Sequence, residues 1–248
     1  MDLPDSSETY MLKEYWNKRF AVEDNFEWCK SYCDFRHLTI QHVRKCDRIL
    51  MLGCGNSRLS EEMYNDGYTN IVNIDYSPVV IEKMRQKHQE LIGMEYLQMD
   101  ITKMTFDKNS FDVIIEKGTL DTLLVDEKNL WNPSEHSRKF MHTVLLQISQ
   151  ILKIGGRFIS VAFSQPHFRK LYLAKSEYNW SITTNIFGYY FRYFFYVMEK
   201  GRELSNDDKN LEVSQNKKIC EGDQQCISFS ELEEDNDENF LKNISNIF

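Results

Sequence analysis

The chain contains 248 residues, of which 42% are hydrophobic and 13% aromatic, and it carries a formal net charge of −8. This length and composition suit one globular α/β domain, and the acidic balance argues against a nucleic-acid binder. No apolar run reaches the roughly 18–20 residues that span a bilayer, and the acidic start resembles no targeting signal, so we expect a cytoplasmic protein.

The six cysteines are expected to be reduced thiols, as in most cytosolic proteins. Cys29 with Cys33, and Cys220 with Cys226, are spaced too loosely for a typical zinc site. We therefore expect no metal site. Neither a membrane nor a nucleic acid is expected as a direct partner.

The negative charge is concentrated near the C-terminus. Residues 203–248 contain 12 acidic and 4 basic side chains, whereas residues 1–202 contain 26 of each sign. The C-terminal segment is also rich in Asn, Asp, Glu, Gln and Ser, a composition that buries little surface. We expect residues 1–202 to form the folded domain and residues 203–248 to form a largely disordered acidic tail. Apolar residues at near-helical spacing in 240–248 indicate either a docking element or a frayed terminus.

Strands and helices alternate along residues 1–202. A first, fully apolar strand runs into a glycine turn, and a short helix follows as far as Gly67. After the second strand, Ser77 can cap a helix that has Pro78 in its first turn, a favoured pairing. A further helix is expected between Arg138 and Leu152. The expected strands are residues 48–52, 70–75, 94–100, 111–118, 157–163 and 189–201.

This alternation predicts a parallel sheet with helices on both faces. Ligands of such sheets bind beyond the carboxyl ends of the strands. Glycine or acidic residues stand at the ends of the first four expected strands, so they should converge on one crevice. These residues are Gly53, Gly55, Asp75, Asp100 and Glu116.

The glycine turn departs from the fingerprint of dinucleotide-binding proteins, G-x-G-x-x-G. Gly53 and Gly55 occupy the first two glycine positions, but Arg58 occupies the third. The missing glycine argues against close packing around the phosphates of a dinucleotide. An adenosine cofactor without phosphates would not need it. S-adenosyl-L-methionine fits, with its ribose on Asp75 and its methionine portion against the glycine turn.

Two carboxylates are candidates for binding this cofactor. Asp75 follows the glycine turn by about twenty residues, at a strand end where a carboxylate accepts hydrogen bonds from ribose hydroxyls. Its alternative role is a helix cap near Ser77. Asp100 follows the third strand, where it could accept a hydrogen bond from an adenine amino group. Its alternative is a loop carboxylate without a partner.

Aromatic residues precede the first strand. Trp16 and Phe20 are four residues apart and share one face if this stretch is helical, and Trp28 follows them. Aromatic faces attract cations such as the sulfonium of the cofactor. The three rings therefore either cover the cofactor or pack on the core.

The stretch from Glu116 to Asp121 places three charges directly after a buried strand. Gly118 allows the backbone to approach a ligand closely. Charges at a strand end over a crevice favour a functional role for Glu116, Lys117 and Asp121. A solvated turn is the alternative.

The chain contains six segments that are distinctive in combination: LGCGNSRLS, VNIDYS, MDITKM, FDVIIEKGTLD, ILKIGGRFISV and QPHFRK. They resemble the Rossmann-like, seven-strand class I methyltransferases that depend on S-adenosylmethionine. Among these, the chain is most similar to the lysine methyltransferases of translation elongation factor 1-alpha. Within that group, it is most similar to the family of the fourth enzyme. The resemblance extends from about Tyr15 to Gly201, and the acidic tail matches only loosely.

The motifs and this resemblance together make ten residues candidates for binding S-adenosylmethionine. The resemblance implies that the aromatic rings close over the cofactor and that Gly53 lies against its methionine part. It also implies that Asp75 and Tyr76 hold ribose and adenine, and that Asp100 and Ile101 border the adenine ring. The ten candidates are Trp16, Phe20, Trp28, Gly53, Gly55, Asp75, Tyr76, Asp100, Ile101 and Lys117.

The resemblance further implies a protein-lysine N-methyltransferase whose partner is translation elongation factor 1-alpha. The sulfonium is a good leaving group, so the enzyme chiefly has to align a neutral lysine amine with the methyl carbon. Glu116 and Asp121 belong to the segment that this family needs for activity, and they could orient the amine or take its proton.

Two alternatives stay open. One is a methyltransferase of the same fold that acts on a small molecule or on another protein, and the other is an inactive cofactor-binding module. A small-molecule enzyme would be expected to have a larger lid, and the only insertion of any size is 164–188.

Overall fold

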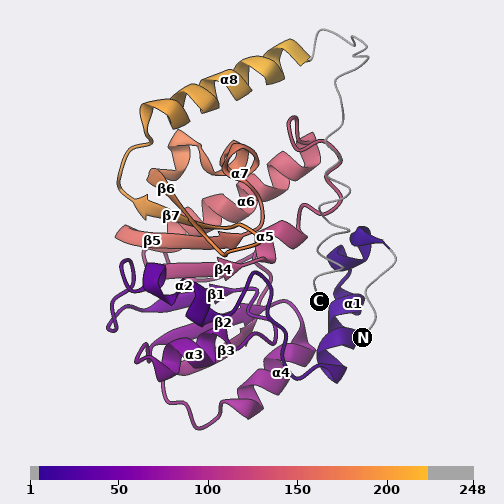
Figure 1. The fold of residues 1–248 in the computed structure, drawn as a ribbon, viewed down its shortest axis with the longest axis vertical. Coiled ribbons are helices and arrows are strands. Elements are labelled where there is room, and N and C mark those ends of the chain that lie inside the picture. Colours follow the sequence, from indigo (N-terminus) through magenta and orange to yellow (C-terminus); the bar gives the residue numbers. More distant parts are fainter. Residues whose placement is uncertain (1–5, 223–248) are drawn as a thin grey trace.

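A seven-stranded sheet forms the centre of the structure, a computed structural model that describes residues 6–222 (Figure 1). The strand order is β3-β2-β1-β4-β5-β7-β6. β1 to β5 are parallel, whereas β7 runs antiparallel to both β5 and β6. This is the Rossmann-like, seven-strand arrangement predicted from the sequence. The strands are β1 (Ile49–Leu52), β2 (Ile71–Asp75), β3 (Met94–Gln98), β4 (Phe111–Lys117), β5 (Leu152–Ala162), β6 (Trp180–Phe187) and β7 (Tyr193–Lys200).

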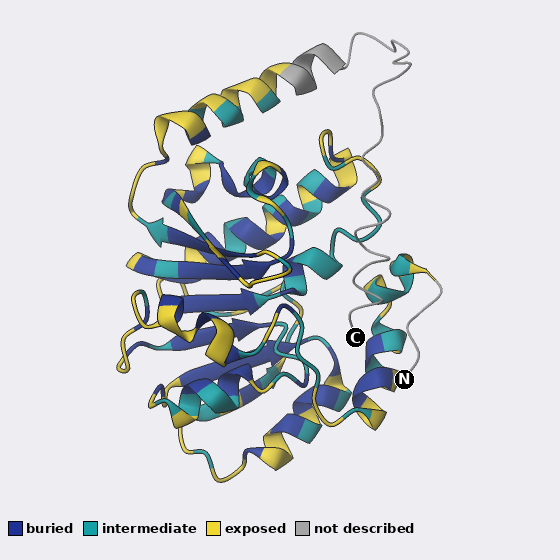
Figure 2. Cartoon of the chain, in the orientation of Figure 1, coloured by how far each residue is buried: buried dark blue, intermediate teal, exposed yellow. Residues whose placement is uncertain are grey.

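Helices cover both faces of this sheet. The described residues form the helices η1 (Ser7–Met11), α1 (Lys13–Val22), α2 (Tyr32–Thr39), α3 (Leu59–Asn65), α4 (Pro78–Lys87), α5 (Thr119–Thr122), α6 (Glu135–Ile151), α7 (Pro166–Leu173), η2 (Ser176–Tyr178) and α8 (Asn206–Gly222). Alternate residues of β1 face opposite sides. Ile49 and Met51 pack with α2 and α3, whereas Leu50 and Leu52 pack with α6 and α7. Buried residues are therefore concentrated in the strands and on the sheet-facing sides of the helices (Figure 2).

The antiparallel end of the sheet is where the sequence prediction was incomplete. The segment 164–188, expected to be an insertion, contains α7 and the edge strand β6. Among residues 6–222, β6 pairs only with β7. Buried and exposed residues alternate irregularly along it, so it lacks the period-two pattern of a half-buried strand. β5 begins at Leu152, earlier than expected, and its register against β4 shifts between Phe111 and Val113.

The segment after Arg202 also differs from its prediction. The expectation of disorder is wrong for residues 206–222, which form α8. Asp208, 2% exposed, pairs with Lys170 of α7 at 2.8 Å, and Glu212 accepts a hydrogen bond from the backbone N–H of Ser176 at 3.1 Å. Acidic composition suggested a solvated tail, but here basic and N–H groups of the body bind the acids. Residues 223–248, including the apolar stretch 240–248, lie outside the described residues.

None of the helices within residues 6–222 is long and apolar enough to cross a membrane. The same part of the chain contains no group of three or more His, Cys, Asp or Glu side chains that could hold a metal ion. Cys29, Cys33, Cys46 and Cys54 are free thiols.

Leu204, just before α8, provides a test of how this segment packs. Leu204 is 6% exposed and belongs to the core cluster that includes α6 and α7. We expect Leu204→Ala to lower the free energy of unfolding by ~2–4 kcal/mol, because the truncation leaves a cavity in a packed core. Val213→Ala, at a position of α8 that is 53% exposed, should change it by less than ~0.5 kcal/mol. Urea unfolding followed by circular dichroism measures both values, and equal effects would contradict the packing of this segment on the body.

Candidate functional site

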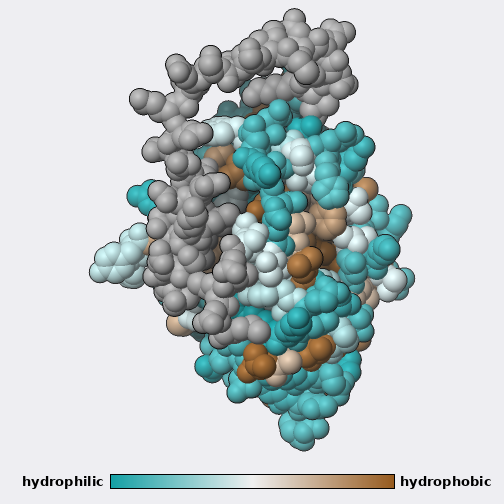
Figure 3. All heavy atoms as spheres, turned by 90° about the vertical axis from the view of Figure 1, so that its right-hand side faces the viewer, coloured by the Kyte–Doolittle hydropathy of each residue, from teal (hydrophilic) through white to brown (hydrophobic). Residues whose placement is uncertain are grey.

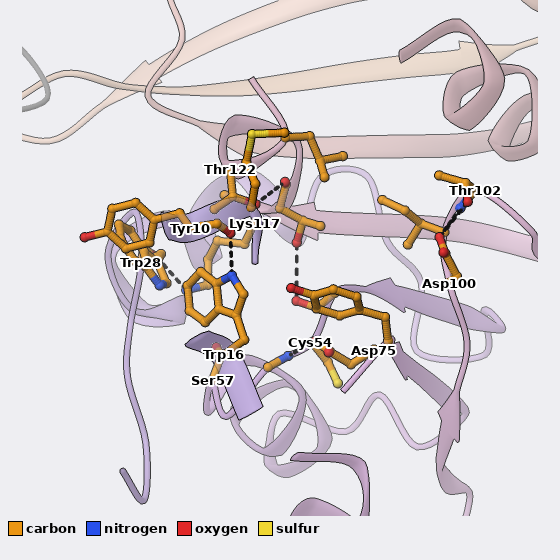
Figure 4. Close-up of a pocket in the computed structure, with 18 of the residues that line it drawn as sticks. Tyr10, Trp16, Trp28, Cys54, Ser57, Asp75, Asp100, Thr102, Lys117 and Thr122 are labelled. Atoms are coloured by element: carbon orange, nitrogen blue, oxygen red, sulfur yellow. Dashed lines mark hydrogen bonds between the residues drawn. The ribbon is translucent and has the colours of Figure 1, made fainter. Parts of the chain in front are cut away.

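A cavity of about 350 Å³ lies beyond the carboxyl ends of the parallel strands, within the range of about 300–1,000 Å³ typical of small-molecule sites. Figure 3 faces this side, where hydrophobic side chains form separate patches among hydrophilic ones. Figure 4 shows Trp16 and Trp28 at one end of the cavity, Asp100 at the other and Asp75 between them. All ten residues predicted to bind a cofactor line it: Trp16, Phe20, Trp28, Gly53, Gly55, Asp75, Tyr76, Asp100, Ile101 and Lys117.

Both glycines of the turn after β1 have backbone angles that other residues rarely adopt, with φ of +60° at Gly53 and +50° at Gly55. A Cβ atom on Gly53 would collide with the side chain of Thr119, whose hydroxyl donates to the carbonyl of Leu52 at 3.0 Å. A Cβ atom on Gly55 would meet the ring of Phe20 at 3.4 Å. The glycines therefore allow the turn after β4 and the N-terminal segment to close around the cavity.

The N-terminus of α3 binds a carboxylate of the chain itself. Glu27 accepts hydrogen bonds from the backbone N–H of Arg58 at 2.5 Å and from Oγ of Ser57 at 2.9 Å. In dinucleotide-binding folds this helix N-terminus holds the pyrophosphate. Because the carboxylate of Glu27 already accepts these hydrogen bonds, the donors are not available to a phosphate. The site therefore suits a ligand without phosphates.

Asp75 ends β2 with a carboxylate that is 4% exposed. It accepts the backbone N–H of Gly55 at 3.0 Å and that of Ser77 at 2.9 Å. Burial raises the pKa of Asp75 to about 6, although these N–H donors favour the charged form. Each carboxylate oxygen can accept a second hydrogen bond. The capping role near Ser77 is therefore compatible with binding ligand hydroxyls in the cavity.

The opposite end of the cavity is more open. Asp100 is exposed, and its Oδ1 accepts hydrogen bonds from the N–H and Oγ1 of Thr102, at 2.8 and 2.7 Å. Tyr76 is half-buried, and Nζ of Lys13 lies 5.6 Å from its ring centroid. Ile101 is partly buried against the main core. This end offers a flat ring, an apolar side chain and a carboxylate to a ligand.

The aromatic residues ahead of β1 combine core packing with cavity lining. Trp16 and Phe20 are 8% and 5% exposed, and their rings stack with centroids 5.5 Å apart. Trp28 meets Trp16 edge to face at 6.2 Å. The two alternatives drawn from the sequence are therefore not exclusive, because these rings pack on the core and also line the cavity.

A buried arginine lies among these rings, and sequence reasoning missed it. The guanidinium of Arg19 lies 4.2 Å from the ring centroid of Phe26 and 5.9 Å from that of Trp28. It also binds Glu23 at 2.7 Å and the hydroxyl of Tyr15 at 2.9 Å. The spacing of four residues between Arg19 and Glu23 was the available signal. The rings thus already contact one cation of the chain.

Lys117 joins the end of β4 to the N-terminal segment. Its side chain is 4% exposed, and Nζ donates to Glu27 at 2.8 Å and to the carbonyl of Trp28 at 2.6 Å. Because the same Glu27 carboxylate caps α3, this one group connects β4, α3 and the backbone beside Trp28.

Glu116 was predicted to act on an incoming amine, but it is not among the residues that line the cavity. It is 1% exposed and accepts hydrogen bonds from the hydroxyl of Ser160 and from the N–H of Leu120. Its position at the end of β4 suggested a side chain directed at the crevice. The structure instead directs it into the interior, where it joins β4, β5 and α5.

Asp121 is likewise absent from the cavity wall. It accepts the backbone N–H of Phe163 at 3.1 Å and forms an ion pair with Arg169, a fully buried residue of α7. The segment from Glu116 to Asp121 is therefore held in place by buried charges. Lys117, Gly118 and Thr119, which lie between those two residues, line the cavity.

Other parts of the cavity wall come from segments that no motif marked. The 3-10 helix η1 closes one side, where the carbonyl of Tyr10 accepts the indole N–H of Trp16 at 2.6 Å. The first turns of α6 close another side, and only the fold brings these segments together. The lining residues of these unmarked segments include Tyr10, Met11, Phe26, Thr122, Leu123, His136, Ser137 and Phe140.

Comparison with known sequences identifies relatives of this chain. Residues 44–231 match a family described as a methyltransferase domain. The chain is 39% identical over 207 residues to EEF1A lysine methyltransferase 4 of Mus musculus, a match that covers 82% of this chain and 81% of that protein. It is 36% identical over 171 residues to the eEF1A lysine and N-terminal methyltransferase of Homo sapiens, covering 68% of this chain and 24% of that protein. The first match thus spans most of both chains.

Solved structures of low sequence identity share the fold. N-methyltransferase NodS from Bradyrhizobium japonicum WM9, in complex with S-adenosyl-L-homocysteine, has a TM-score of 0.57 at 14% identity, covering 79% of this chain and 100% of that chain. The cyclase SpnF has a TM-score of 0.54 at 12% identity, covering 80% of this chain and 98% of that chain. Because the same fold serves different chemistry, function has to be argued from the site.

The buried carboxyl of Glu116 predicts a pH dependence of stability. Burial raises its pKa to about 7, whereas an unfolded glutamate titrates near ~4.3. Between these values the folded state binds more protons than the unfolded state. The contribution of Glu116 is therefore fully present below about pH 4 and is lost as the pH rises to about 7, by up to ~3 kcal/mol.

Glu116→Gln should remove this loss, so the stability of the variant relative to wild type should increase between about pH 5 and pH 8. Glu95→Gln, at an exposed position of β3, should show no such trend. Urea unfolding at several pH values measures the difference. Parallel pH profiles for wild type and Glu116→Gln would contradict a raised pKa.

Proposed function

Because this chain belongs to the methyltransferase-domain family, we propose that it is an S-adenosylmethionine-dependent protein-lysine N-methyltransferase that acts on translation elongation factor 1-alpha. The observation that carries this proposal is the cavity, in which a buried carboxylate stands beside a helix N-terminus already occupied by Glu27. The relatives of the chain, named for lysine methylation of this factor, support the choice of substrate.

The residues of the cavity fit the cofactor. The carboxylate of Asp75 has capacity for the ribose hydroxyls, and Tyr76, Ile101 and Oδ2 of Asp100 suit an adenine ring with its amino group. The methionine portion is assigned to the turn at Gly53 and Gly55. The absence of a phosphate matches the negative charge of Glu27 at the start of α3.

When bound, S-adenosylmethionine supplies a methyl group attached to a sulfonium. The sulfur departs as a neutral thioether, so the transfer needs no acid catalyst. The protein has to hold the lysine nitrogen in line, and such positioning can contribute ~7–11 kcal/mol. A free lysine titrates near ~10.4, so its amine must lose a proton. The aromatic wall formed by Trp16, Phe26 and Trp28 excludes water and thereby favours the neutral amine.

Glu116 and Asp121 act in this proposal as positioning residues. Both are already hydrogen-bonded inside the protein, so they hold the turn from Lys117 to Leu120 against the cavity. The proton of the amine is then released to solvent at the cavity mouth, with the desolvated aromatic wall lowering the pKa of the lysine.

We also propose a cytoplasmic site of action, because the substrate is a translation factor. Direct binding to nucleic acid is not part of the proposal, since the net charge of −8 opposes contact with phosphate backbones.

The ribose contact can be tested on binding alone. Asp75→Asn should weaken the binding of S-adenosylhomocysteine about tenfold to a hundredfold, because a hydrogen bond to a charged acceptor contributes ~1.5–3 kcal/mol. Asp107→Asn, at an exposed position before β4, should bind like wild type. Isothermal titration calorimetry measures both dissociation constants. An unchanged constant for Asp75→Asn would place the ribose elsewhere.

The substrate assignment requires the purified factor. After incubation with the enzyme and S-adenosylmethionine, elongation factor 1-alpha should carry added methyl groups on a lysine, detected by mass spectrometry of its peptides. We expect Asp75→Asn to slow this reaction at limiting cofactor and Asp107→Asn to leave it unchanged.

Three other outcomes separate the alternatives. Methylation of another protein or of a metabolite, with none on the factor, would retain the methyltransferase and reject the substrate. Binding of S-adenosylhomocysteine without any methyl transfer would favour the inactive cofactor-binding module. A failure to bind the cofactor at all would reject the whole proposal.

A further inference from the structure

Two adjacent tyrosines extend into solvent at the tip of the hairpin that joins β6 to β7. The exposed fractions of Tyr189 and Tyr190 are 101% and 107%, whereas no other large hydrophobic side chain within the described residues exceeds the 86% of Ile92. Single exposed apolar side chains are common, whereas adjacent exposed rings form a patch of the kind that marks interaction sites. Tyrosine is also enriched among the residues that dominate binding energy at protein interfaces.

The backbone beneath these rings is firmly held. Gly188 has a φ of +95°, and a Cβ atom there would collide with the carbonyl of Phe191, so only glycine fits this tight turn. The ring of Tyr193 stacks on Phe187 at 5.5 Å and meets Phe191 at 4.9 Å. The tip is thus presented by a packed base, which reduces the ordering entropy that binding would otherwise lose.

The tip projects from the same edge of the sheet as the cavity. β7 pairs with β5 so that Phe194 lies opposite Ala162, the last residue of β5. Phe163, the next residue, contacts Phe191 at 6.2 Å and Trp28 at 6.3 Å between ring centroids. Because Trp28 lines the cavity, aromatic rings form a continuous path from the hairpin base to the cavity wall.

We propose that Tyr189 and Tyr190 dock the folded surface of the protein substrate beside the lysine that enters the cavity. This inference rests on the proposed function and extends it from the reacting lysine to the surface around it. A small-molecule substrate would be enclosed by the cavity and would not reach these rings. Tyrosines also stack on nucleic-acid bases, but residues 1–202 contain 26 acidic and 26 basic side chains, so they lack the basic excess that draws in a phosphate backbone.

The test is the steady-state kinetics of the full chain with purified elongation factor 1-alpha. The double variant Tyr189→Ser/Tyr190→Ser should raise KM for the factor ~10-fold or more, with kcat and the affinity for S-adenosylhomocysteine within about twofold of wild type. The control Ile92→Ser removes an exposed apolar side chain just before β3. β3 is the edge strand farthest from β6, so this variant should leave KM for the factor unchanged. Thermal melting should be the same for all three proteins, because the side chains replaced are exposed.

A short peptide that contains the methylated lysine separates docking from damage to the cavity. It lacks the folded surface, so wild type and the double variant should methylate it equally. Equal loss of activity on peptide and factor would overturn the docking role, as would an unchanged KM for the factor. Loss of affinity for single-stranded RNA with an unchanged KM would assign the tyrosines to nucleic acid instead.

The failure of this inference differs from the failure of the proposed function. If wild type does not methylate the factor, the proposed substrate and the docking role fail together. If wild type methylates the factor and the double variant does so with the same KM, only the docking role fails. Tyr189→Phe/Tyr190→Phe should retain the wild-type KM, because the ring faces make the contact, and a loss equal to that of the serine variant would overturn this mode of docking.

Discussion

The carboxylate of Glu27 lies between the ammonium group of Lys117 and the first turn of α3. This group neutralises a nearly buried lysine at the end of β4, and it accepts hydrogen bonds from the N–H of Arg58 and the hydroxyl of Ser57 at the start of α3. From residue 6, where the described part of the chain begins, the segment before β1 contains helices and no strand of the sheet. Its position over the cavity therefore depends on these polar contacts and on the aromatic packing of Trp16 and Phe20 against α4.

Buried charges fix the remaining walls of the cavity. Asp75 is held by two backbone N–H groups, Glu116 by a hydroxyl and an N–H, and Asp121 by Arg169 and an N–H. Removing charge from water is expensive, and each group persists because it has partners. The result is a site of fixed shape with few free acids or bases. This suits methyl transfer from a sulfonium, which depends on alignment more than on proton transfer.

The parallel and the antiparallel parts of the sheet contribute to different regions of the surface. The parallel strands β1 to β4 form the cavity beyond their carboxyl ends, as expected for open α/β sheets. The antiparallel pair β6 and β7 adds a hairpin whose tip reaches the same edge, so surface beyond the cavity can contact a large substrate. Ring contacts through Phe163 connect the two regions. The cavity for the cofactor and the proposed docking surface for a protein substrate therefore lie along the same edge of the sheet.

The sequence by itself determined the parallel half of the fold and the cofactor side of the cavity. Apolar runs and their spacing identified β1, β2 and β4, and the position of a residue at the end of a parallel strand is a property of topology. For this reason the order of residues alone was enough to predict Gly53 and Asp75 at the cavity. Local caps such as Ser77 were equally readable, because donor and acceptor lie within a few residues.

Only the tertiary structure decided the contacts between distant residues. A strand end does not specify the side on which its last side chain is buried, so Glu116 was expected in the cavity and lies in the interior. Glu27 carries no local signal, since its partners Ser57, Arg58 and Lys117 lie far along the chain. For α8, the acidic composition predicted a solvated segment. It does not reveal that a basic group elsewhere in the chain, Lys170, pairs with the buried Asp208. In each case the interaction energy depends on the distance between groups in space, which the order of residues does not contain.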